Sequence, residues 1–203
     1  MKNNSFDIST YIQRFRTVFP EYTRDPWYIP SEMENILAGR IRILGPEYKV
    51  HGSIAIHQSA RVEEHVILKG QVIIGAGCFI GAHAYLRGGV FLDDNCIVGP
   101  GCEVKSAMIF ANSALAHFNF VGDSIIGAGV NMEAGSVIAN HYNERTDKTI
   151  HMMLGNERMT LPVTKFGALV GDRTKIGANA VLSPGTLLKP DSVVSRLALI
   201  EQC

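Results

Sequence analysis

Aliphatic residues recur at every sixth position through the middle of this chain. The longest unbroken run comprises Ile56, Val62, Leu68, Ile74, Ile80, Leu86, Leu92, Val98 and Val104. Single steps of five residues then end at Ile109 and Ile126, and a last run begins at Val170. A period of six fits neither an amphipathic helix, whose period is 3.6, nor a long flat strand. It is typical of short strands joined by corners, and it predicts an all-β chain folded as a parallel β-helix of hexapeptide repeats.

Three such hexads make one triangular coil of eighteen residues. Successive coils stack at the spacing of neighbouring strands, about 4.8 Å, so residues eighteen apart become vertical neighbours. Cys78 and Cys96 are such a pair. We expect both to point inward, where a free cysteine acts as a small hydrophobic side chain.

Two segments do not follow the repeat. Residues 1–48 are predicted to form an N-terminal helical cap on a β-helix of residues 49–203. Apolar residues at helical spacing over residues 5–19 predict one helix, and Ser31 with Glu34 predicts the capped start of a second helix that ends at Gly39. We expect this region to cover the open first coil, because a stack of repeats needs a cap. Residues 141–165 break the period and are predicted to form an extended functional loop.

Charge and composition narrow the class of protein. Nineteen basic and nineteen acidic residues among 203 give a net charge of zero, which argues against nucleic acid or a membrane surface as a partner. We see no run of the roughly 18 to 20 apolar residues that would span a bilayer, and no signal peptide. The four cysteines fit neither a zinc site nor a secreted disulfide framework, so a cytoplasmic location is expected.

A column of cations is predicted on one outer corner. Lys69, Arg87 and Lys105 are spaced eighteen and eighteen, each directly after a core aliphatic. The functional interpretation is an anion site for a phosphate or pyrophosphate. The alternative is a solvated basic edge on which the long side chains splay apart, since their repulsion falls below ~1 kcal/mol in open water.

His117 is the candidate general base. It lies where two register slips interrupt the hexads, near the predicted cation column, and imidazole can take a proton from an attacking amine near neutral pH. A zinc site like that of the γ-class carbonic anhydrases would need a second histidine five residues later. Gly122 stands there, so no metal is expected.

The run EVKSAMIFANSALAHFNFVGDSIIGAGVNMEAGSVIAN resembles the acetyltransferase domain of the bifunctional N-acetylglucosamine-1-phosphate uridyltransferase/glucosamine-1-phosphate acetyltransferases. The later run TKFGALVGDRTKIGANAVLSPGTLLKP resembles their archaeal relatives, and the similarity covers roughly residues 50–195. The resemblance implies a left-handed β-helix, a cytoplasmic homotrimer with active sites between subunits, and transfer from acetyl-CoA to an amino-sugar phosphate such as glucosamine-1-phosphate.

The resemblance also implies roles for individual residues. His117 would be the catalytic base, and the substrate-binding residues would be Arg87, Lys105, Asn131 and, in the loop, Lys148. The acetyl-CoA contacts would be Ala134, Asn140, Asp172, Lys175 and Ser183. Backbone N–H groups of residues 133–135 are a candidate oxyanion site.

This chain departs from the family pattern in three places. Phe120 replaces a tyrosine, Asp172 stands where a serine is common, and the C-terminal part of the helix is about one coil shorter, which bears on Lys175 and Ser183. No Gly-rich nucleotide loop opens the chain, so no nucleotidyl transfer is expected. The alternative function is a non-catalytic protein that binds a sugar phosphate or nucleotide sugar. A transferase of another acyl group, or to another sugar, is a third possibility.

Overall fold

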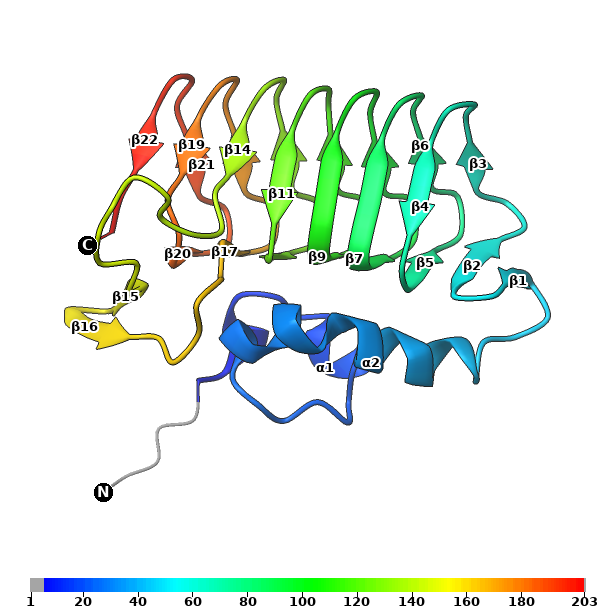
Figure 1. Cartoon of the computed structure of the whole chain (residues 1–203), viewed down its shortest axis with the longest axis horizontal. Helices are drawn as coiled ribbons and strands as arrows, with labels where there is room; N and C mark the ends of the chain where they lie inside the picture. The colour runs from blue at the N-terminus through cyan, green and yellow to red at the C-terminus, as the bar shows by residue number, and fades with distance from the viewer. Residues whose placement is uncertain (1–5, 203) are drawn as a thin grey trace.

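The hexapeptide pattern produces a parallel β-helix in the computed structural model, which describes residues 6–202 (Figure 1). Each coil contributes one strand to each of three faces, here named A, B and C. Inward side chains of all three faces form one apolar core along the helix axis, and Cys78 and Cys96 lie in it with 1% and 0% of their surface exposed. The predicted fold is therefore confirmed.

Face A consists of β2 (Ile54–His57), β5 (Val72–Ile74), the second halves of β7 (Tyr85–Leu92) and β9 (Glu103–Ile109), β12 (Ile125–Ile126), β17 (Ala168–Val170) and β20 (Thr186–Leu188). Face B consists of β3 (Arg61–Val62), β6 (Phe79–Ile80), β8 (Ile97–Val98), β10 (Ala114–Leu115), β13 (Asn131–Met132), β18 (Lys175–Ile176) and β21 (Val193–Val194). Face C consists of β4 (Ile67–Lys69), the first halves of β7 and β9, β11 (Phe120–Gly122), β14 (Val137–Ile138), β19 (Val181–Leu182) and β22 (Leu199–Ile200).

The register matches the sequence period. Leu68 pairs with Leu86 and Leu86 with Val104, which are steps of eighteen. Val104 pairs with Val121, a step of seventeen, because each five-residue step shortens one coil by a residue. The register shift between Arg87 and Val90, where β7 has one residue more than β9, marks the first of these steps in the sheet.

The N-terminal segment packs along face A and does not cover the first coil, which corrects the expected position of the cap (Figure 1). It contains η1 (Ile8–Thr10), α1 (Phe15–Val18), η2 (Pro26–Tyr28) and α2 (Ile29–Ile41). The physical reason lies in the outer surface of face A, which is also apolar: Ala55, Ile73, Phe91, Met108, Ile125, Leu169 and Leu187 are all buried there. That surface needs a cover, and the helical segment supplies it.

The predicted helices differ in detail. Of the segment 5–19, residue 5 lies outside the described residues, and residues 6–19 form only the short η1 and α1 rather than one helix. The second helix begins at Ile29, because Pro30 sits in its first turn, where a proline favours helix initiation. It runs through Gly39 and ends at Ile41. Ser31 is therefore inside the helix, and its hydroxyl donates to the Tyr28 carbonyl at 2.8 Å instead of capping.

The first coil is edged by a different element. β1 (Tyr48–His51) pairs antiparallel with β2 and covers the free edge of face A. The excursion of residues 141–165 leaves the helix between β14 on face C and β17 on face A. It carries a hairpin of β15 (His151–Leu154) and β16 (Glu157–Thr160), and its Ile150, Met152 and Leu161 join the apolar cluster on face A.

Candidate active site

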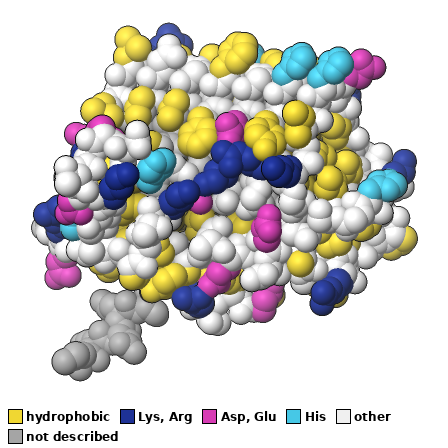
Figure 2. All heavy atoms as spheres, viewed as in Figure 1, with side chains coloured by type: hydrophobic (Ala, Val, Ile, Leu, Met, Phe, Trp, Pro, Cys, Tyr) yellow, Lys and Arg dark blue, Asp and Glu magenta, His cyan; other side chains and the backbone are white. Residues whose placement is uncertain are grey.

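The cation column exists as predicted on the outer side of face C. Lys69 pairs in register with Arg87, and Arg87 with Lys105. Figure 2 shows Lys and Arg side chains gathered across the middle of the face that Figure 1 presents, with acidic side chains next to them.

Both family-implied phosphate ligands have a carboxylate partner. Arg87 Nε donates to Glu103 Oε1 at 2.7 Å, and about a third of each side chain is exposed. Lys105 Nζ lies 2.8 Å from Asp123 Oδ2, and these two side chains are only 16% and 8% exposed. Two of the three cations in the column, Arg87 and Lys105, therefore stand in ion pairs rather than as bare charges.

Asp123 connects Lys105 to Asn140. The Asn140 side-chain amide donates to the same Asp123 oxygen that Lys105 binds, and the Asn140 oxygen lies 3.0 Å from Nδ1 of His141. The Asn140 carbonyl accepts from Phe166 N–H, which fixes the start of β17 after the excursion. The structure therefore joins Lys105, implied for the substrate, and Asn140, implied for acetyl-CoA, in one network.

His117 lies in the turn that leads from face B into face C, three residues before Phe120 of β11. Its side chain is exposed, and its carbonyl accepts from Gly135 N–H at 2.9 Å. Ala134 thus occupies the same corner one coil further on. The candidate base and one implied acetyl-CoA contact are vertical neighbours.

The turn that carries Ala134 is held from both sides. The Glu133 carboxylate accepts from Ala178 N–H at 2.9 Å and from two nitrogens of Arg196. The Arg196 guanidinium, followed by the Ala178 amide, lowers the pKa of Glu133 to about 2. The N–H groups of Glu133 and Gly135 already donate to Ile176 and His117 carbonyls. Among the described residues, only the Ala134 N–H of this trio has no hydrogen bond, so the candidate oxyanion site narrows to that group.

Other residues that the resemblance implies do not lie at the corner of His117 and Ala134 within one chain. Asn131 and Lys175 pair in register on face B, with their side chains exposed. Ser183 is buried after β19, and its carbonyl accepts from the Thr186 hydroxyl. Lys148 is exposed in the excursion and lines a pocket of ≈ 550 Å³ with residues 161–165.

Asp172 is buried, and its carboxylate forms hydrogen bonds with backbone groups of the fold. It is 4% exposed, and its two carboxylate oxygens accept from Ala128 N–H at 2.8 Å and Gln13 N–H at 3.1 Å. Its own N–H donates to the Tyr11 carbonyl. These bonds tie the N-terminal segment to the corner between faces A and B.

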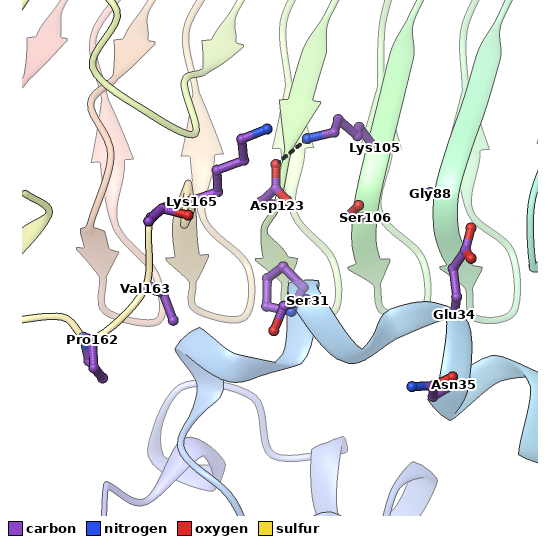
Figure 3. Close-up of a pocket in the computed structure, with 12 residues that line it drawn as sticks. Ser31, Glu34, Asn35, Gly88, Lys105, Ser106, Asp123, Pro162, Val163 and Lys165 are labelled. Carbon is purple, nitrogen blue, oxygen red and sulfur yellow. Dashed lines mark hydrogen bonds and ion pairs between the residues drawn. The ribbon is translucent and has the colours of Figure 1, made fainter. Parts of the chain in front are cut away.

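A pocket of ≈ 670 Å³ opens at the corner between faces C and A (Figure 3). Lys105, Ser106 and Asp123 form its floor, the start of α2 forms one wall, and residues 162–165 of the excursion form another. Sequence reasoning did not single out Asp123 or Lys165. The spacing of eighteen residues from Lys105 to Asp123 is a sequence signal for this pair, although the shortened coil places Gly122 in register with Lys105 and Asp123 one residue further on.

Comparison with known proteins agrees with this architecture. Residues 72–106 match the family model described as bacterial transferase hexapeptide (six repeats). Residues 72–106 of the parallel β-helix therefore consist of this transferase hexapeptide repeat. The chain is 37% identical over 160 residues to the bifunctional protein GlmU of Methanocaldococcus jannaschii, a match that covers 70% of this chain and 38% of that protein. The resemblance inferred from the sequence is confirmed.

A second relative is the bifunctional sugar-1-phosphate nucleotidylyltransferase/acetyltransferase of Sulfurisphaera tokodaii, with 32% identity over 105 residues, 48% of this chain and 25% of that protein. The chain thus spans well under half the length of these relatives. Among solved structures, a hexapeptide transferase family protein from Anaplasma phagocytophilum has a TM-score of 0.37 and 18% identity, with 72% of each chain covered. No helix in residues 6–202 is long and apolar enough to cross a bilayer.

Proposed function

We propose that the protein is an acetyl-CoA-dependent N-acetyltransferase acting on an amino-sugar phosphate, with His117 as the general base. The observation that carries the proposal is the arrangement around face C. Arg87 and Lys105 stack in register on its outer side, and His117 stands in the turn that enters the same face, directly below Ala134. The 32% identity over 105 residues to the bifunctional sugar-1-phosphate nucleotidylyltransferase/acetyltransferase supports the same reaction.

The chemistry needs few groups. The amine nitrogen of the sugar attacks the carbonyl carbon of the acetyl thioester, and His117 takes the proton from that amine. The Ala134 N–H stabilises the oxyanion that forms on the acetyl carbonyl. When the intermediate collapses, the carbon–sulfur bond breaks and the CoA sulfur takes the proton that His117 received, so CoA leaves as the thiol. Asn140 and, on other coils, Lys175 and Ser183 contribute to holding acetyl-CoA, and Asn131 and Lys148 contribute to holding the sugar.

Arg87 and Lys105 have different parts in phosphate binding. A partly exposed ion pair of this kind contributes only about 0–1 kcal/mol, so Arg87 can leave Glu103 for a phosphate at little cost. Lys105 is more deeply buried than Arg87 and pairs with Asp123. The Asp123 carboxylate also accepts from the Asn140 amide, which holds it in place. Lys105 therefore keeps its position while Arg87 closes on the ligand.

We further propose a homotrimer in the cytoplasm. Asn131 and Lys175 on face B cannot reach the face-C cations of their own chain across the core, but face B of one copy can lie against face C of the next. Large apolar side chains exposed at the two faces and their shared corner support such a contact: Ile67, Ile97, Phe118, Val193, Leu197 and Leu199. The described cysteines are free thiols, which suits a reducing compartment.

The function is tested by thiol release from acetyl-CoA with a panel of amino sugars, their 1-phosphates and nucleotide-linked forms. We expect release that depends on a phosphorylated amino sugar and on no added metal. Thiol release with none of the acceptors would support the non-catalytic binding protein instead.

A further inference from the structure

The pocket of ≈ 670 Å³ lies beyond the phosphate ligands as seen from His117. His117 precedes β11, Gly122 at the end of β11 pairs with Lys105, and Asp123 opens the pocket directly afterwards. The order along face C is therefore base, cations, pocket. A bare sugar phosphate with its amine at His117 and its phosphate at Arg87 and Lys105 ends where this pocket begins.

The pocket is built by elements outside the repeat. α2 approaches the corner closely because glycines stand there: a Cβ on Gly89 would lie 2.5 Å from Met33 Cβ, and one on Gly70 would lie 2.6 Å from a Glu34 carboxylate oxygen. Gly70 and Gly89 both have positive φ, which glycine adopts without strain. The opposite wall is the excursion at Pro162–Lys165, which packs back from the hairpin. The volume falls within the range of about 300–1,000 Å³ usual for small-molecule sites.

Charges in the pocket are separated. The Lys165 side chain extends toward Asp123 and Lys105 (Figure 3). Two cations thus converge on one carboxylate, and among residues 6–202 Lys165 forms no ion pair. Lys105 and Lys165 exceed Asp123 by one positive charge at this end of the pocket, while Glu34 on the α2 wall brings the formal charge of the whole lining to zero. The α2 wall offers acceptors and donors for hydroxyls and amides instead: Ser31, Glu34 and Asn35.

We propose that this pocket binds a nucleoside phosphate group joined to the sugar phosphate, so that the acceptor is a nucleotide-linked amino sugar. Lys165, together with Lys105, holds the second phosphate. The two carboxylate oxygens of Glu34 accept hydrogen bonds from the ribose hydroxyls. Pro30, Pro162 and Val163 give the apolar surface against which a flat base can pack. This proposal rests on the proposed function for the direction of the sugar, and it makes α2 and the excursion the elements that determine acceptor specificity.

The test measures binding without turnover. UDP, GDP and dTDP are titrated calorimetrically into the full-length protein, with pyrophosphate as the reference ligand. We expect at least one nucleoside diphosphate to bind about tenfold or more tightly than pyrophosphate, the scale of one good charged hydrogen bond. Lys165→Met and Glu34→Gln should each weaken that nucleotide about tenfold, and Glu34→Gln should leave pyrophosphate binding unchanged. Lys189→Met, which removes an exposed lysine on the corner between faces A and B, serves as the matched control.

Two results would overturn the proposal: equal affinity for pyrophosphate and for all three nucleotides, or unchanged nucleotide affinity in both pocket variants whose melting temperatures equal that of the wild type. A protein that binds nucleotides in this pocket but releases no thiol would contradict the proposed acetyl transfer and leave the pocket assignment standing. A protein that releases thiol with glucosamine-1-phosphate but binds no nucleotide would support the proposed acetyl transfer and contradict the pocket assignment.

Discussion

Replacing His117 by alanine is expected to lower kcat for acetyl transfer by at least ~10²-fold, the usual scale for a lost general base. The imidazole is exposed and only the His117 backbone takes part in the coil, through the bond from Gly135 N–H. The substitution should therefore leave folding and acetyl-CoA binding intact. Steady-state thiol release at saturating acceptor gives kcat, and calorimetry gives the affinity for acetyl-CoA.

His83→Ala is the matched control for this prediction. His83 stands at the same corner two coils earlier, where its ring stacks on that of His65 with centroids 5.3 Å apart. We expect its loss to change kcat by less than twofold. A His117→Ala enzyme with wild-type turnover would remove the histidine from the mechanism.

Replacing Phe110 by alanine is expected to destabilise the protein by about 3–5 kcal/mol, the cost of emptying a fully buried phenylalanine site. Phe110 is fully buried between face A and the N-terminal segment, where its ring packs against Phe15, Phe19 and Phe91. For a chain of this length the melting temperature should fall by roughly 6 to 20 °C. Because this cluster joins the helical segment to the repeat, trypsin should also cut that segment faster in the variant.

Ile43→Ala controls for the loss of an apolar side chain from the same segment, since Ile43 is 77% exposed. Its melting temperature should match that of the wild type within about 2 °C. A Phe110→Ala protein that melts like the Ile43→Ala protein would show that the N-terminal segment contributes little to stability.

The β-helix could be predicted from the sequence because each coil depends only on local spacing. The eighteen-residue rule placed Lys69, Arg87 and Lys105 in one column and Cys78 over Cys96 in the core. The position of the N-terminal segment was mispredicted, although a signal was present. On face A the residue before every core aliphatic is apolar, as at Ile73, Phe91 and Leu169. The same position is charged at Glu103 on face C and at Arg61 and Lys175 on face B. A strand that is apolar on both sides needs a second layer.

The site was harder to predict, because its residues are positioned by the strand register, by side-chain rotamers and by segments outside the repeat. The register predicts which cations stack, but it does not predict that Arg87 pairs with Glu103 and Lys105 with Asp123, since these are choices of side-chain rotamer. The role of Asp172 followed from the N-terminal segment, whose docking position could not be derived from the repeat. Lys165 and Glu34 meet across a pocket only because the excursion and α2 return to the same corner.

The central claim is that the face-C cations and the His117 corner form a single transfer site. A crystal structure of the protein with CoA and an amino-sugar phosphate tests it most directly. We expect the phosphate on Arg87 and Lys105, and the sugar amine within about 2.6–3.2 Å of a His117 ring nitrogen, directly or through one water. A phosphate bound away from face C, or an amine on the far side of the coil from His117, would contradict the account.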